Sequence, residues 1–285
     1  MLDIMQALRN KGWQGKALAL RMGVCGDGKI RRVTSYDAAQ PDSIHRSLQA
    51  MQMLGISGVV HIWNGPGDSH NHQAMMACWN ECQHFGMSFA VMLDQWIGKP
   101  PDPTASTVAA IKHPDFQKVL NSPIYLPEKY VLEFSLNSAA NVDIGKVQVQ
   151  CPRIRILSKN SGYSWVTPDI ASLAKANAKP TMKIPSLCPY FNDGGYPLPN
   201  GVGTPPAQCT GRDWNKSMWG AHGTTPDNKP DDSVRVREHQ GGHWWMDQAD
   251  VTPISAKYVM LATWDDYEES TGVEYWAAIL AGLRI

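Results

Sequence analysis

Apolar segments with the character of β-strands alternate with segments of helical periodicity along most of the chain. Strands are expected at residues 17–24, 56–63, 88–94, 130–136, 153–157, 181–187 and 257–263. Helices are expected at residues 41–54, 71–85, 104–120, 168–177 and 273–283; in the first of these, Ile44, Leu48 and Met51 recur at helical spacing. Strands that alternate with helices form parallel sheets, so the pattern predicts an α/β fold.

Chain length favours one barrel over several small domains. The chain has 285 residues, of which 43% are hydrophobic. A (β/α)8 TIM-type barrel takes about 250 residues and buries one large core. We therefore expect residues 1–285 to form a single β/α barrel domain. The pattern supplies seven strands, so an eighth strand must be short, irregular or missing.

A long segment before the last strand has no clear periodicity. Residues 188–251 are rich in Gly and Pro and contain four tryptophans: Trp214, Trp219, Trp244 and Trp245. In a barrel, the loops that follow the strands build the active site. We interpret the segment as a long active-site loop region; a disordered insertion is the alternative, which the tryptophans disfavour.

Composition argues against nucleic acid and membranes as partners. Basic and acidic residues balance at 26 each, so the formal net charge is zero and no basic patch is evident. The apolar runs are shorter than the roughly 20 residues that span a bilayer, and residues 1–14 lack the apolar segment of a signal peptide. These features predict a cytoplasmic or virion-associated protein.

Three residue pairs have spacings that some metal sites use: Cys78 and Cys82, His70 and His72, and His239 and His243. The cysteines lie one helical turn apart, which buried core residues also do. Gly241 and Gly242 disfavour a metal-binding helix around the last pair. We expect no bound metal and no cofactor.

Aromatic and polar residues gather where predicted strands end, which is the face where barrel enzymes place their sites. Sugar rings stack on aromatic side chains, and polar neighbours bind hydroxyl groups. His61 lies two residues before Trp63, so both side chains are expected to point the same way and to line the cleft. The predicted substrate-binding residues are Trp63, Asn64, Asp94, Trp96, Tyr190, Trp264, Tyr267 and Glu274.

The last predicted strand leads directly into a cluster of acids. Asp265, Asp266, Glu268 and Glu269 occupy four of five consecutive positions. If the segment is partly buried, repulsion between them favours keeping at least one protonated. A protonated acid beside an ionised one is the equipment of glycoside hydrolysis. A solvated acidic loop is the alternative, against which the neighbouring aromatic residues argue.

These residues also resemble two known families. Residues 263–270 read Thr-Trp-Asp-Asp-Tyr-Glu-Glu-Ser, which resembles the Thr-Trp-Asn-Asp-Tyr-Gly-Glu-Ser signature of glycoside hydrolase family 71, the fungal endo-α-1,3-glucanases. They also resemble the Asn-Glu-Trp-x-Glu-Gly-Thr segment of family 99, the endo-α-mannosidase and mannanase group, with Thr271 and Glu274 continuing the match. Residues 55–63 are similar to an early barrel strand of both families, and residues 186–191 to a segment of family 71.

The resemblance implies an endo-acting glycoside hydrolase that cleaves an α-linked glucan or mannan-like polysaccharide. It assigns Glu269 as general acid and Asp266 as base, which either activates water or assists attack by the sugar's own 2-hydroxyl. Asp265 and Glu268 depart from the family patterns, and each adds negative charge. The alternative is a catalytically inactive carbohydrate-binding or structural barrel, for instance one assembled into a larger particle such as a phage tail, where an active barrel would be a depolymerase. A metal-dependent hydrolase is the third hypothesis.

Overall fold

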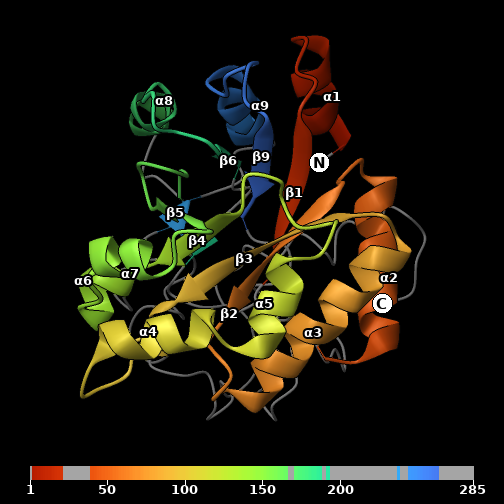
Figure 1. Cartoon of the computed structure of the whole chain (residues 1–285). Coiled ribbons are helices and arrows are strands. Elements are labelled where there is room, and N and C mark those ends of the chain that lie inside the picture. The colour runs from red at the N-terminus through yellow and green to blue at the C-terminus, as the bar shows by residue number, and fades with distance from the viewer. Residues whose placement is uncertain are drawn as a thin grey trace, which may run out of the picture.

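The computed structural model describes residues 2–21, 39–165, 170–187, 191–192, 236–237 and 243–262. For residues 2–4, 191–192, 236–237 and 243–246 only the backbone is described. The described chain is built around one parallel sheet with helices packed on it (Figure 1).

Seven strands form this sheet in the order β5-β4-β3-β2-β1-β9-β6, and the neighbours with assigned register are parallel. Their bounds are β1 Lys16–Arg21, β2 Gly58–Trp63, β3 Ser88–Asp94, β4 Tyr130–Phe134, β5 Arg155–Ser158, β6 Ser186–Leu187 and β9 Tyr258–Leu261. The predicted α/β class and the parallel arrangement are confirmed. Strand β6 is much shorter than the predicted 181–187: the Met182 N–H bonds back to Lys179 O in a turn, and Pro185 lacks the N–H that a ladder needs.

A single residue connects the two edges of the sheet. Tyr163 makes one parallel bridge to Lys159, just beyond β5, and another to Ile184, just before β6. The described residues contain no eighth strand in this sheet, which fits the expectation of a short, irregular or missing one. The sheet therefore curls toward closure through Tyr163, and the complete eight-stranded barrel stays a prediction.

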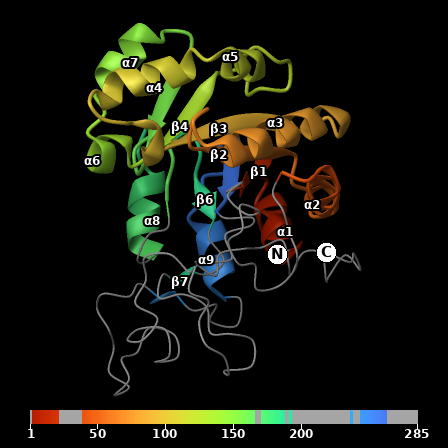
Figure 2. The same ribbon diagram turned by 90° about the horizontal axis from the view of Figure 1, so that it is seen from below.

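Helices cover the outer face of the curled sheet (Figure 2). Those labelled beside β1 to β4 are α2 Pro41–Met53, α3 Ser69–His84, α4 Pro103–Ile111, α5 Pro114–Leu120, α6 Leu136–Ala140 and α7 Ile144–Gln150, with the short η1 Gln95–Ile97 following β3. The remaining helices are α1 Leu2–Asn10, α8 Ile170–Asn177 and α9 His243–Asp250, of which α1 and α9 pack together.

Two predicted elements need correction. Residues 104–120 form two helices, because Pro114 disfavours a helical conformation at His113 and starts a new helix. Residues 188–251 are not all loop, since they contain α9 and the antiparallel pair of β7 Phe191–Asn192 and β8 Val236–Arg237. The predicted helix at 273–283 lies outside the described residues.

Alternation along the strands separates two sides of the sheet. Val59, His61 and Trp63 share the side that faces the helices, since Trp63 stacks on Phe116 of α5 with ring centroids 5.0 Å apart. The opposite side lines the inside of the curl, where a Cβ on Gly58 would meet Leu18 Cδ2 at 2.6 Å. Side chains on both faces are buried, which is typical of a parallel sheet.

Among the described residues, none of the helices combines the length and the hydropathy that a bilayer crossing requires.

Candidate active site at the carboxyl ends of the strands

A row of polar and aromatic residues runs along the carboxyl ends of β2 to β5. Asp94 pairs with Phe134 in the register of β3 and β4. Continuing the neighbouring registers by one residue puts Asn64 next to Asp94 and Lys159 next to Phe134. Alternation places Asn64 and Asp94 on the side opposite Trp63 and Leu93, so both lie on the inside of the curl.

Asp94 is the acidic group of this row and is only 9% exposed. Its carboxylate accepts the backbone N–H of Trp96 at 3.2 Å and thereby caps η1. Burial raises the pKa of Asp94 to about 6, although the N–H groups of Trp96 and Gln95 act in the opposite direction. A carboxyl with this pKa exchanges protons near neutral pH, which suits proton donation and strong hydrogen bonding to a substrate.

Asn64 lies at the end of β2 and is held by the start of α3. Its backbone N–H donates to Asn71 Oδ1 at 2.8 Å, and its side-chain Nδ2 donates to Asp68 Oδ2 at 2.9 Å. Its Oδ1 is buried and accepts no hydrogen bond. Because buried polar atoms are usually satisfied, this oxygen is a ready acceptor for a ligand hydroxyl.

Aromatic side chains accompany the row. Phe134 packs against Trp165 with ring centroids 4.9 Å apart, and Lys159 Nζ lies 5.0 Å from the Phe134 ring centroid. Trp96 is 65% exposed, so its indole is available for stacking on a sugar. Asn160 is occupied locally, since its Oδ1 accepts the backbone N–H of Trp165 at 3.2 Å.

Glu133, which the sequence analysis did not single out, lies near this edge but on the helix-facing side, because it pairs in register with Leu93. It is 6% exposed and accepts the backbone N–H of Leu136 at 3.1 Å. Burial raises the pKa of Glu133, opposed first by the Leu136 N–H and then by that of Lys159. Tyr163 donates its hydroxyl to the Glu133 carbonyl at 2.7 Å. One acid inside the apolar strand Val-Leu-Glu-Phe was the signal that could have identified it.

The structure corrects the predicted orientation of Trp63 and His61. They do point the same way, but toward the helices and not toward the inside of the curl. Trp63 is 0% exposed, stacks on Phe116, and donates its indole N–H to His72 Nδ1 at 3.2 Å. His61 is also fully buried, on the same side as Phe89. Trp63 is therefore a core residue and presents no face to a sugar.

Several predicted site residues lie outside the described part of the chain. They are the catalytic candidates Asp266 and Glu269 and the binding candidates Tyr190, Trp264, Tyr267 and Glu274. Strand β9 ends at Leu261, and Ala262 donates its backbone N–H to Leu187 O at 2.8 Å. Because the sheet is parallel, β9 delivers the chain to the edge that carries Asp94.

One group of described residues has the composition of a metal site. The ligand atoms of His72, His113 and Asp115 lie within 4.8 Å of one another, between the starts of α3 and α5. Nevertheless, His72 Nδ1 accepts the Trp63 indole N–H, and His113 Nδ1 accepts the Asp115 backbone N–H at 3.3 Å. With these lone pairs in use, His72 Nε2 is left to donate to Asp115 Oδ2 at 3.1 Å. His70, whose spacing from His72 some metal sites use, is not a member of this group.

Cys78 and Cys82 are both fully buried and free, which confirms their interpretation as core residues. A hydrogen bond from Cys82 lowers the pKa of Cys78, and burial raises the pKa of Cys82. They lie on the inner face of α3, away from the polar row.

Comparison with known proteins gives a fold but no sequence relative. No protein-family model and no curated protein matches the chain. Among solved structures, two of the GH99 endo-α-mannosidase from Bacteroides thetaiotaomicron are similar, with TM-scores of 0.60 and 0.61 and sequence identities of 12% and 13%. The similarity covers 92% of this chain in both cases, and 87% and 88% of the mannosidase. A glycoside hydrolase-like protein also matches, with TM-score 0.55, 10% identity, and coverage of 92% of this chain and 87% of the other. The chain therefore has a GH99-like fold, as predicted.

Proposed function

We propose that this protein is a glycoside hydrolase that cleaves a polysaccharide, with Glu269 as general acid and Asp266 as base. The observation that carries the proposal is the carboxyl edge of the sheet, where Asp94 is a buried acid with a pKa of about 6 beside the unpartnered Asn64 Oδ1. The GH99-like fold supports the reaction class, since barrel enzymes place their sites at this edge.

The short chain distance between Ala262 and the acidic segment supports our proposal that this segment lies at the same edge. Asp266 follows Ala262, the last described residue, by four positions, and Glu269 follows it by seven. At roughly 3.3–3.6 Å per residue, both stay within about 25 Å of the end of β9. In the proposed reaction Glu269 protonates the leaving-group oxygen, and Asp266 removes a proton from water or from the sugar's 2-hydroxyl. Asp94 and Asn64 bind substrate hydroxyls, and exposed Trp96 stacks on a sugar ring.

A carbohydrate-binding barrel without activity is the second candidate. The extra acids Asp265 and Glu268 favour it, because each changes the charge beside the proposed catalytic pair. Both candidates place sugar at the same edge, and only the first requires bond cleavage.

A substrate screen separates them. The full chain is incubated with α-mannan, α-1,3-glucan and other polysaccharides, and released reducing ends are measured over time. A hydrolase releases oligosaccharides from at least one polymer, and the double variant Asp266→Asn with Glu269→Gln releases none. A polymer that binds but is not cleaved would favour the binding barrel, and release by the double variant would reject the catalytic assignment.

A further inference from the structure

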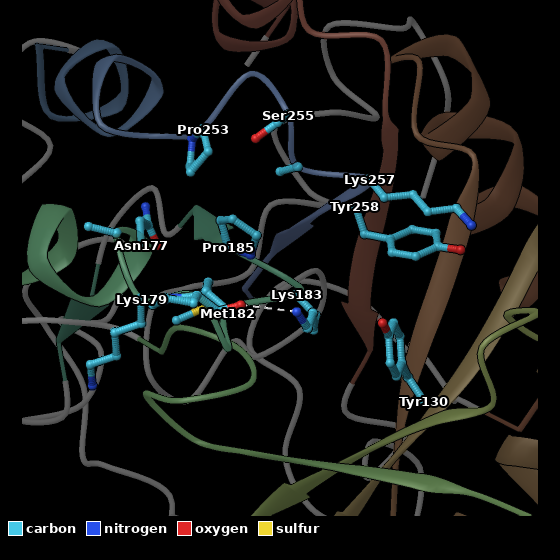
Figure 3. Close-up of a pocket in the computed structure, with 13 residues that line it drawn as sticks. Tyr130, Asn177, Lys179, Met182, Lys183, Pro185, Pro253, Ser255, Lys257 and Tyr258 are labelled. Carbon is cyan, nitrogen blue, oxygen red and sulfur yellow. Dashed lines mark hydrogen bonds between the residues drawn. The ribbon is translucent and has the colours of Figure 1, made fainter.

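A cavity of about 500 Å³ opens at the opposite end of the sheet, at the amino ends of the strands (Figure 3). Its walls come from the first residues of β4 and β9, from the turn after α8, and from the turn between α9 and β9. Its lining includes Tyr130, Asn177, Lys179, Lys183, Lys257 and Tyr258. The volume lies in the range of about 300–1,000 Å³ that is typical of small-molecule sites.

Among the described residues, the sheet has no full strand between β5 and β6, and the cavity lies in this part of the sheet. Tyr163 bridges these edges only near the carboxyl end of β5. At the amino end, Tyr130 and Tyr258 begin β4 and β9, whereas β6 starts at Ser186, which pairs with Met260 farther along β9. No described strand fills this position, and the turn after α8 forms the wall instead. The cavity therefore belongs to the part of the sheet that the described strands leave open.

Asn177 gives the cavity an unpartnered polar group. The residue is 4% exposed, and its Nδ2 donates to Val251 O at 3.2 Å. Its Oδ1 is buried and accepts no hydrogen bond. A buried acceptor of this kind favours a ligand that brings a hydroxyl donor.

The other polar groups make the cavity cationic. Its lining contains three lysines and no Asp or Glu. Lys257 pairs with Glu128, which also accepts the Tyr258 hydroxyl at 2.8 Å. Lys183 Nζ instead donates to the carbonyl of Pro180 at 3.0 Å, and Lys179 Nζ donates to the carbonyl of Asn160 at 2.6 Å. A carbonyl does not neutralise the charge of either lysine. Tyr130 and Tyr258 meet edge to face, with ring centroids 6.4 Å apart, and add an aromatic wall.

We propose that this cavity binds a sugar acid of monosaccharide size, at a site separate from the proposed catalytic edge. The carboxylate of the sugar pairs with Lys183, a hydroxyl donates to Asn177 Oδ1, and the pyranose ring lies against the tyrosine wall. The carboxylate matches a lysine whose hydrogen bond goes to a carbonyl and not to an acid, and hydroxyl donors match the asparagine. Inorganic phosphate offers a charge but no comparable set of hydroxyl donors.

Binding to the full chain tests this proposal. D-Glucuronate, D-glucose and inorganic phosphate are titrated separately and followed by calorimetry or ligand-observed NMR. We expect glucuronate to bind with a Kd on the order of 1 mM, and glucose and phosphate to bind at least about ten-fold more weakly. Equal binding of glucose or phosphate, or no glucuronate binding at concentrations up to about 20 mM, would overturn the proposal.

Variants locate the site. Lys183→Met should weaken glucuronate binding about ten-fold, because it removes the charge-assisted contact from an exposed side chain. The matched control is Lys112→Met, an exposed lysine between α4 and α5, which should bind as the wild type does. Glu269→Gln should also bind glucuronate normally, so that failure of the catalytic assignment is distinguishable from failure of this site. Unchanged glucuronate affinity in Lys183→Met contradicts the inference.

Discussion

Acidic residues prevail at the carboxyl end of the sheet and basic residues at the amino end, with Arg21 and Lys159 at the first end and Glu128 at the second as exceptions. At the carboxyl ends, Asp94 terminates β3, Glu133 is the penultimate residue of β4, and Asp68 and Asp102 cap the helices that start there. At the amino ends lie basic residues: Lys16, Lys129, Arg155, Lys183 and Lys257. Helix N-termini favour anions and helix C-termini favour cations, and a parallel α/β fold puts these termini at opposite ends. Much of the polarity thus follows from the architecture.

Charge alone therefore identifies no site in this molecule. What marks each end is a buried asparagine oxygen without a hydrogen-bond partner: Asn64 Oδ1 beside Asp94, and Asn177 Oδ1 in the cavity. The two ends differ in their ionisable groups. At the carboxyl end the pKa of Asp94 is raised toward neutral pH, whereas the cavity at the amino end has no acid in its lining. Proton transfer is expected at the first end and binding without chemistry at the second.

The largest expected effect is the loss of kcat in variants of the proposed catalytic pair, which distinguishes catalysis at the carboxyl end from sugar binding there. Asp266→Asn and Glu269→Gln should each lower kcat about 10²- to 10⁴-fold on a cleaved polysaccharide, because each removes a proton-transfer group. Steady-state kinetics measures this effect. Glu268→Gln, a neighbouring acid outside the proposed pair, serves as the control and should change kcat far less. Wild-type rates in both catalytic variants would reject this assignment.

Replacing Trp63 or Trp96 compares the effect of a helix-facing residue on stability with that of an exposed one, both near the carboxyl ends of the strands. Trp63→Ala should lower the free energy of unfolding by about 3–5 kcal/mol, because the buried indole leaves a cavity and an unpaired His72. Trp96→Ala, at 65% exposure, should change it by no more than about 0.5 kcal/mol while weakening substrate binding. Urea denaturation and binding assays check both. Equal destabilisation by the two changes contradicts the separation of sides.

The pH dependence of stability tests the raised pKa of Asp94. An unfolded aspartate ionises near pH 3.9, whereas Asp94 in the folded protein has a pKa of about 6. Below pH 3.9 both states are protonated and the group has no effect. As the pH rises from about 3.9 to about 6, the unfolded state ionises first, so the free energy of unfolding falls. The loss levels off above pH 6 and amounts to about 3 kcal/mol at pH 7.

Asp94→Asn removes this titration. The stability of the variant relative to the wild type should therefore rise as the pH is raised from 4 to 7. Chemical denaturation at several pH values measures the difference. A difference that does not depend on pH would show that Asp94 titrates at its ordinary pKa.

The smallest expected effect concerns metal binding by the group of His72, His113 and Asp115. The purified protein should carry no stoichiometric Zn, because His72 and His113 both use Nδ1 as acceptors for internal hydrogen bonds. Elemental analysis checks this expectation, with His113→Gln as the matched variant. One Zn per chain that is lost in this variant, together with activity lost on chelation, would instead support the metal-dependent hydrolase hypothesis.

Local patterns in the sequence determined much of the fold. Strand β3 occupies the predicted residues 88–94, and α2 and α3 match their predicted segments within two residues, because apolar periodicity and helix caps act over short distances. The family resemblance in residues 263–270 also anticipated the GH99-like fold, although the roles of Asp266 and Glu269 stay predictions.

Only the tertiary structure decided the remaining features. The sequence predicted that His61 and Trp63 share a side, but the packing of α3 and α5 decided that this side faces the helices. Likewise, the raised pKa of Asp94 and the cavity beside Tyr130 and Tyr258 depend on segments far apart in the chain. Alternation and capping are local properties, whereas burial and the closure of a sheet depend on contacts that no short stretch of sequence encodes.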